Sequence, residues 1–224
     1  PSKQARDEVM GIFSFFEDIP IGPFQQNVPW DWTTWSEYRR SFEASVKVPL
    51  NYASYVGHIP LRLAAMGMDA WDRAATPEEI AKMAELLDDA LAAGALGLSD
   101  NMHDHDGENR PVPSMLADDA EFLALFDVMD RHPNTCYQII VDTFMRMNGP
   151  ANLKRLEKLL TGRKIRVQIA GGIPTLWFQA GILPEMQKTI EEMRAAGIDV
   201  WPGFAHVSPT SVLSITKSLI FAQS

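Results

Sequence analysis

The sequence predicts an α/β fold in which a parallel sheet of about five strands is covered by helices. Helical and extended segments alternate along most of the 224 residues. The extended segments are short and almost wholly apolar, which is typical of strands buried on both faces of a parallel sheet. Such a sheet is either most of an eight-stranded α/β barrel, which needs about 250 residues, or an open doubly wound sheet. Periodicity alone leaves both architectures open.

The elements follow one another in a regular order, and one helix is marked at both ends. Thr76 suits the N-cap, Pro77 the first helical position and Glu79 the third position of a capping box, while Gly94 ends the helix. We expect the other helices at about 34–45, 60–67, 118–131, 150–161 and 183–196, and strands at about 51–57, 95–99, 136–141, 165–170 and 198–204.

The chain is expected to form a single domain over 1–224, with a loop-rich segment over 1–47 and βα units over 48–224. The segment over 29–35, "PWDWTTW", indicates a packed loop rather than regular structure. Its aromatic side chains, together with Tyr38, either line an apolar acyl pocket or hold the loop against the body. The first residue is not methionine, which suggests that the chain begins inside a longer protein.

Composition excludes several classes of protein. A net charge of -9 argues against a nucleic-acid partner, because phosphates would be repelled. No apolar run reaches the roughly 18 residues of a membrane span, and no signal peptide is visible. The single cysteine, Cys136, excludes an internal disulfide and suits a cytoplasmic protein.

The densest polar cluster is "LSDNMHDHDGENR" over 98–110, which follows the expected strand at 95–99. Barrel enzymes assemble their active sites at the carboxyl ends of the strands, and this loop is expected to lie at that end. Imidazole and carboxylate groups suit zinc and other divalent ions, which makes Asp100, His103 and His105 metal candidates. The alternative is a solvated turn with surface histidines, which its aspartate, asparagine and glycine residues favour.

Three further side chains are candidates for binding substrate. His58 ends the first expected strand, and His206 follows the last one. Arg62, one helical turn after His58, suits a bidentate contact with a carboxylate. The alternatives are a partly buried His58 bonded to backbone and an ordinary ion pair on the helix surface for Arg62.

Four passages together resemble one protein family. They are "VPWDWTTWSEYRRSF", "NYASYVGHIPLRLAAMG", "RAATPEEIAKMAELLDDALAAGALGLS" and "EEMRAAGIDV", in that order. They are similar to the D-aminoacylase branch of the amidohydrolase superfamily, which comprises the N-acyl-D-amino-acid deacylases. The resemblance implies an incomplete TIM-type (β/α) barrel and zinc, or another divalent metal, that activates water to hydrolyse an amide. It also implies that the chain begins after two strands that carry the family's His-x-His pair and cysteine ligand.

The chain departs from this family at two positions that normally bind metal. The family's Tyr-x-Thr-His-x-Arg aligns with 137–142, where Ile140 takes the place of the histidine. Its Ser-His-x-Lys aligns with the following strand, where Gly171 falls roughly at the histidine position. Neither residue can donate an imidazole lone pair to zinc.

Besides the possibility that the loop over 98–110 builds a replacement site with different chemistry, two hypotheses about function follow. The first is a hydrolase acting on carbon–nitrogen bonds other than peptide bonds, with a small N-acyl-D-amino acid or related amide as substrate. The second is a metal-free, inactive relative that uses the barrel for binding or as a scaffold. A free-standing five-strand portion would expose sheet edges, so missing chain segments or a homo-oligomer are expected to complete it.

Overall fold

A computed structural model describes residues 2–17, 19–106, 108, 110–141, 148–172 and 181–204 of the chain. In this part of the chain, five strands form one sheet in the order β1-β2-β3-β4-β5, and every neighbouring pair is parallel. The strands are β1 (Val56–Gly57), β2 (Gly97–Met102), β3 (Cys136–Val141), β4 (Arg166–Gly172) and β5 (Val200–Phe204).

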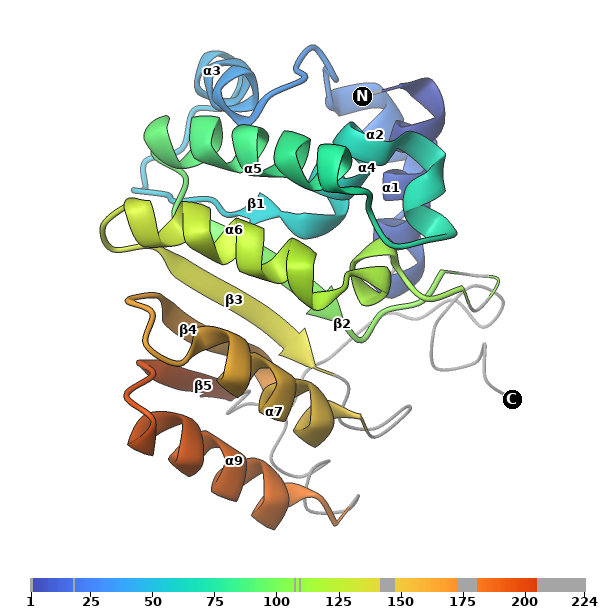
Figure 1. The fold of residues 1–224 in the computed structure, drawn as a ribbon. Coiled ribbons are helices and arrows are strands. Elements are labelled where there is room, and N and C mark those ends of the chain that lie inside the picture. Colours follow the sequence, from blue (N-terminus) through green and yellow to red (C-terminus); the bar gives the residue numbers. More distant parts are fainter. Residues whose placement is uncertain are drawn as a thin grey trace.

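The order of the strands decides between the two architectures that periodicity leaves open. Each strand lies beside the next one in sequence, and Figure 1 shows the intervening helices α5, α6, α7 and α9 on the same face of the sheet. In a doubly wound sheet the order in which successive strands are added reverses once, and helices cover both faces. The fold is therefore part of an α/β barrel, as the family resemblance implies. The helices between the strands are α4 (His58–Met66), α5 (Pro77–Ala92), α6 (Asp119–Arg131), α7 (Gly149–Leu160) and α9 (Leu183–Ala195).

The N-terminal segment is more helical than expected. It contains α1 (Lys3–Phe16), α2 (Ile21–Asn27) and α3 (Trp35–Ser45), and the sequence predicts only the last of them. Among the side chains of α1 whose burial the structure describes, Ala5, Met10 and Ile12 are the buried apolar ones. The expectation of a loop-rich segment over 1–47 does not include α1 and α2. Within the predicted loop over 29–35, residues 29–34 have no regular structure, and Trp35 begins α3.

The ends of the elements show where local sequence signals are strong. The capping box at Thr76 is present: its hydroxyl accepts from the Glu79 amide at 3.3 Å, and its own amide donates to the Glu79 carboxylate at 2.8 Å. β1 is shorter than predicted, because only Val56 and Gly57 pair with β2. β2 is longer, because pairing with β3 continues to Met102, so Asp100 lies inside the strand.

The two faces of the sheet have different environments. Leu98, Tyr137 and Val167 lie side by side on neighbouring strands. All three are fully buried and pack against the helices in one apolar core. Their chain neighbours, such as Gln138 and Ile140, are half-buried on the opposite face. In a barrel that opposite face is the interior.

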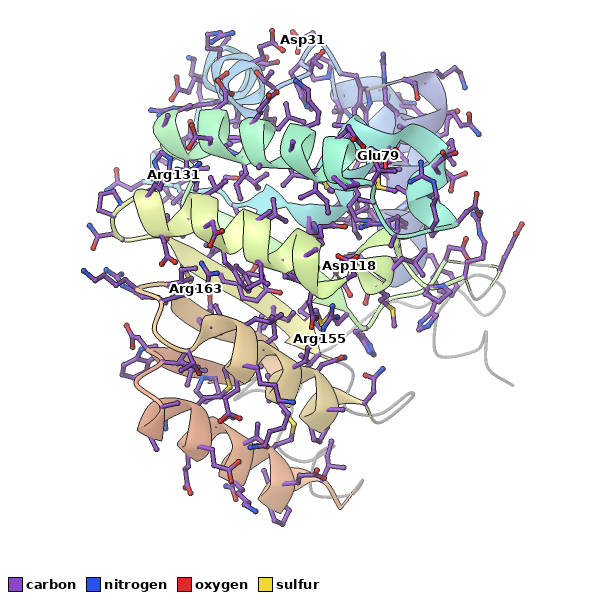
Figure 2. All side chains as sticks on the ribbon, in the orientation of Figure 1. Asp31, Glu79, Asp118, Arg131, Arg155 and Arg163 are labelled. Carbon is purple, nitrogen blue, oxygen red and sulfur yellow. The ribbon has the colours of Figure 1, made fainter. Side chains whose placement is uncertain are left out.

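The solvent side of the helix layer is laced with ion pairs. Figure 2 shows Arg155 and Arg163 beside α6 and α7. Arg155 pairs with Asp119 at 2.6 Å, and Arg163 pairs with Asp127 at 2.7 Å. Among the described residues, no helix is both long enough and apolar enough to cross a membrane.

Candidate functional site

The main polar cluster is built around His58, the first residue of α4. Its Nδ1 lies 3.0 Å from Asp100 Oδ1, and its Nε2 lies 2.7 Å from Glu121 Oε1. All three side chains have no exposed surface. An ionised carboxylate only accepts hydrogen bonds, so each ring nitrogen must donate a proton. His58 is therefore an imidazolium held between two carboxylates.

The direction of the pKa shifts agrees with this geometry. Burial by itself would lower the pKa of His58, but the charge of Asp100 and the hydrogen bonds that the ring donates to both carboxylates raise it to about 9. Burial would raise the pKa of Asp100, yet His58 and the Tyr137 hydroxyl hold it below its ordinary value. The pKa of Glu121 is likewise lowered against burial, by His58 and then Arg62.

Two more side chains complete this cluster, which we call the His58 network. Arg62, on α4, donates through Nη1 to Glu121 Oε2 and through Nη2 to the Arg73 carbonyl at 2.8 Å. Tyr137, on β3, donates its hydroxyl hydrogen to Asp100 Oδ2 at 2.7 Å. Two cations face two carboxylates, so the network is neutral although its charges are buried. The pairing matters because burying an unpaired charge carries a large desolvation free energy. The His58 network consists of His58, Arg62, Asp100, Glu121 and Tyr137.

This network lies between the sheet and the helices and not in the barrel interior. Asp100 is in register with Ile139, which faces the helices, and Glu121 comes from α6. Of the predicted site residues, the structure thus brings together His58, Arg62 and Asp100, but in a covered layer. A direct contact of His58 or Arg62 with substrate would require that layer to open.

Sequence reasoning missed the two partners in this network for identifiable reasons. Glu121 stands three residues after Asp118, the N-cap of α6, and so resembles the last residue of a capping box. Its backbone amide does donate to Asp118, but its side chain turns inward to His58. Tyr137 lies in an apolar strand and resembles an ordinary core residue. Its isolated hydroxyl was the available signal, since a buried tyrosine hydroxyl usually has a partner.

The loop after β2 is folded against the protein. His103, Asp104, His105 and Asp106 are each at most 8% exposed, so the histidines do not lie on the surface as the alternative of a solvated turn expects. Asn101 organises its first turn: Oδ1 accepts from the amides of His103 at 3.0 Å and Asp104 at 2.9 Å. Burial raises the pKa of Asp104 to about 6.

The far side of this loop is held by Asp106 and Arg110. The Asp106 carboxylate accepts from the Glu108 and Arg110 amides at 2.9 and 2.8 Å and from Arg110 Nε at 2.5 Å. The Arg110 guanidinium lies 4.6 Å from the centre of the Trp71 ring and pairs with Glu8 of α1 at 3.4 Å. The loop therefore has its own internal bonds and is tied to the N-terminal helix.

The described residues do not fit a metal centre. Among them, no group of three histidine, cysteine, aspartate or glutamate side chains is arranged so that it could hold an ion, and in the His58 network the facing atoms bond to one another instead. Both Asp100 oxygens already accept hydrogen bonds from the network. Ile140 is next to Asn101 in register on the interior face, where an aliphatic side chain offers no ligand atom. The metal-binding role of Asp100, His103 and His105 stays a prediction, and His206 lies outside the described residues.

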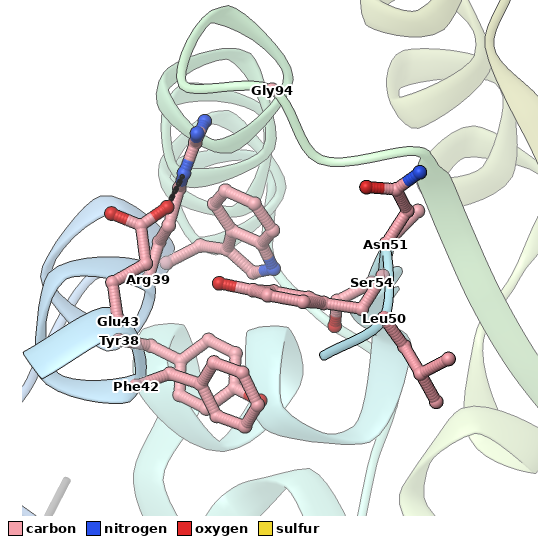
Figure 3. Close-up of a pocket in the computed structure, with 11 residues that line it drawn as sticks. Tyr38, Arg39, Phe42, Glu43, Leu50, Asn51, Ser54 and Gly94 are labelled. Carbon is pink, nitrogen blue, oxygen red and sulfur yellow. Dashed lines mark hydrogen bonds and ion pairs between the residues drawn. The ribbon is translucent and has the colours of Figure 1, made fainter. Parts of the chain in front are cut away.

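A separate pocket of about 290 Å³ lies at the amino ends of β1 and β2, away from this loop. Figure 3 shows Tyr38, Arg39 and Phe42 of α3 on one side and Leu50, Asn51 and Ser54 on the other. The aromatic residues around α3 form a series of ring contacts. It runs from Trp30 and Trp32, whose ring centroids are 5.8 Å apart, to Phe42 and Tyr52, whose ring centroids are 4.8 Å apart. They hold the 28–34 loop to α3, and Trp35 and Tyr38 also line this pocket.

Known proteins with this fold include two solved deacylases. The chain is 25% identical to the N-acyl-D-glutamate deacylase of Bordetella bronchiseptica, with a TM-score of 0.60 over 75% of this chain and 33% of that one. That enzyme was solved with zinc and a phosphonate that mimics the tetrahedral intermediate. The chain is 28% identical to a D-aminoacylase with a binuclear metal centre, with a TM-score of 0.58 and the same coverage. These similarities confirm the predicted resemblance to the D-aminoacylase branch of the amidohydrolases.

Sequence relatives carry no assigned activity. The chain is 34% identical over 149 residues to uncharacterized proteins of Mycobacterium tuberculosis and Mycobacterium bovis. The match covers 61% of this chain and 24% of theirs, so the chain spans about a quarter of their length. No protein-family model matches the chain.

Proposed function

We propose that this chain is part of an amidohydrolase-like barrel that binds a small N-acyl-D-amino acid or a related amide and hydrolyses its carbon–nitrogen bond. The observation that carries this proposal is the shared fold at 25–28% identity with two deacylases over 75% of the chain. The ligand would meet the protein at the carboxyl ends of the strands, where the loop containing His103 and His105 follows β2. These two histidines are the proposed contacts, and because they are at most 8% exposed, a ligand must displace part of what covers them.

No step of the reaction is assigned to a metal held by the described residues, because they do not fit one. Ile140 occupies the interior face at the position aligned with a family ligand. What these residues supply is a rigid frame: strands whose buried faces join one apolar core, and a loop held at the ends of those strands. Further metal ligands and catalytic groups, where the protein uses them, are expected from residues outside the described ranges.

A second candidate function is a barrel that binds an amide-containing molecule without hydrolysing it. The aliphatic side chain of Ile140 favours this alternative, since a hydrolytic centre of the deacylase type loses a ligand there. The frame would be the same in both cases, so the fold does not separate them.

The edges of the sheet support a further part of the proposal. β1 and β5 each have one neighbour among the described strands. Unpaired strand edges invite pairing with another chain or segment. We propose that additional segments of the protein, or a second copy, lie along these edges.

The deciding experiment measures binding and turnover together in the full-length natural protein. The probe is N-acetyl-D-glutamate, with N-acetyl-L-glutamate as the matched control, on protein whose metal content is measured as purified. Release of D-glutamate together with bound metal supports the hydrolase. Calorimetric binding of the D form without release of D-glutamate supports the binding protein. A folded protein that neither binds nor cleaves this probe or other N-acyl-D-amino acids contradicts both proposals.

A further inference from the structure

Asp100 and Asn101 are consecutive strand residues that serve opposite faces of the sheet. Asp100 points into the helix layer and belongs to the His58 network. Asn101 points to the interior face and accepts from the amides of His103 and Asp104. Side chains alternate along a strand, so a change at one residue is transmitted to the next only through the backbone they share.

That backbone is held on both sides of Asn101. Its amide donates to Asp100 Oδ1 at 2.7 Å, so the carboxylate bound by His58 also fixes the next peptide. Its carbonyl accepts from the Ser114 hydroxyl at 2.6 Å, and Ser114 lies in the short helix η2 (Pro113–Leu116) that follows the loop. The peptide that begins the loop is thus tied to the network at one end and to the far end of the loop at the other.

The Asn101 side chain then sets the first turn of the loop. Besides its two accepted hydrogen bonds, it donates through Nδ2 to Asp104 Oδ2 at 2.5 Å. An asparagine that accepts from amides two and three residues ahead fixes a turn in one conformation. Rotation of the Asn101 peptide would break these bonds together and displace His103 and Asp104.

We propose that the His58 network is a positioning device for the 101–106 loop: through Asp100 and Asn101 it sets the conformation in which His103 and His105 are presented at the carboxyl end of β2. His58, Asp100 and Tyr137 are positioning residues in this account and do not touch the ligand. The inference rests on the proposed function only in treating this loop as the ligand contact.

Tyr137 is the residue to change, because Tyr137→Phe removes one hydroxyl and leaves the ring in the core. The matched control is Tyr55→Phe. The Tyr55 hydroxyl donates to Gln168 Oε1 at 3.2 Å, and Gln168 is not a member of the His58 network. Both variants lose one tyrosine hydroxyl hydrogen bond, and only one of these bonds ends on the network.

The measurement is native-state hydrogen exchange at the amides of Asn101, His103 and Asp104. In Tyr137→Phe we expect these amides to exchange about tenfold faster, as for loss of one hydrogen bond to a buried charged group. Amides in the middle of α7 should be unchanged, and Tyr55→Phe should leave 101–104 within about twofold of the original rates. The ring nitrogen signals of His103 and His105 in NMR spectra should shift in Tyr137→Phe and stay in place in Tyr55→Phe.

Equal exchange at 101–104 in the two variants overturns the inference. So does a uniform acceleration that includes α7, because that result indicates general destabilisation. Should Tyr137→Phe not fold, Asp100→Asn is the second variant: it keeps the shape of the side chain but weakens its bonds to His58 and to the Asn101 amide, and it carries the same predictions. Binding of N-acetyl-D-glutamate to the unaltered protein is measured in parallel. Its absence counts against the proposed function, while the exchange rates still decide this inference.

Discussion

The family resemblance implies apolar side chains on the helix side of the sheet and metal ligands on the interior face. The described part of this chain has charged side chains on the helix side and an aliphatic side chain at a ligand position of the interior face. On the helix side, where a barrel normally has apolar packing, the chain places two carboxylates, an arginine and an imidazolium. On the interior face, where the related deacylases are expected to bind metal, Ile140 stands beside Asn101. The face that a polar residue occupies at the end of a barrel strand therefore decides whether it stabilises the fold or is available to a ligand. Distance along the chain alone does not tell which.

The largest expected effect comes from breaking the network in the helix layer. Glu121→Ala leaves the His58 imidazolium and Arg62 without a shared partner in a buried site. We expect the free energy of unfolding to fall by about 3–5 kcal/mol, the cost of removing one member of a buried ion pair. Urea unfolding measures it. Glu185→Ala, at the exposed start of α9, is the control and should change the stability by less than about 0.5 kcal/mol. A loss below about 1 kcal/mol for Glu121→Ala would mean that the layer is not a closed ionic network.

A structural feature could be predicted from the sequence when the residues that determine it are close together in the chain. The capping box at Thr76 and the bounds of β3 were predictable, because the residues that set them are adjacent in the chain. The resemblance also predicted the barrel. The roles of Asp100 and Glu121 were not predictable, since His58 meets them across 42 and 63 residues of sequence. The composition of the loop over 103–106 suggested a solvated turn, because burial depends on what covers a segment and not on its own residues.

The second effect is a dependence of stability on pH. The pKa of His58 is raised from 6.5 to about 9 in the folded protein, so the folded state holds this proton more tightly than the unfolded chain does. Its stabilising contribution is fully present below about pH 6.5 and is lost as pH rises to about 9, on the order of 3 kcal/mol in total. Urea unfolding between pH 6 and 9.5 measures this slope.

His58→Gln provides the comparison for that pH experiment. The variant should be less stable at pH 6 and should lack most of the decline between pH 6.5 and 9, because glutamine does not titrate. Parallel declines in the variant and the original protein would show that other groups cause the effect. At acidic pH a different loss is expected, because the pKa values of Asp100 and Glu121 are lowered and their protonation removes the network's negative charges.

A third experiment compares the two faces on a single strand. Ile139→Ala removes a fully buried side chain from the core, and we expect a loss of about 2–5 kcal/mol. Ile140→Ala removes a half-buried side chain from the interior face and should cost about 1 kcal/mol. Thermal or urea unfolding of both variants gives the difference. Equal losses would indicate that the interior face is as tightly packed as the core and has no room for a ligand.

The smallest effect concerns an exposed hydrogen bond in the same helix layer. Thr76→Ala removes the N-cap of α5 and should cost about 1 kcal/mol. Thr34→Ala removes the matching capping box of α3 and should cost about the same. Both losses should be clearly below that of Glu121→Ala when measured by urea unfolding. Cap losses as large as the network loss would remove the distinction between buried and exposed polar contacts.

The central claim is that His58 is a buried imidazolium bonded to carboxylates on both sides. Nitrogen-resolved NMR of the histidine rings at pH 7.5 tests it directly, with His58→Gln used to assign the signal. Both ring nitrogens of His58 should carry protons, and both N–H signals should be protected from exchange with water. A neutral ring with one protonated nitrogen at that pH would contradict the claim.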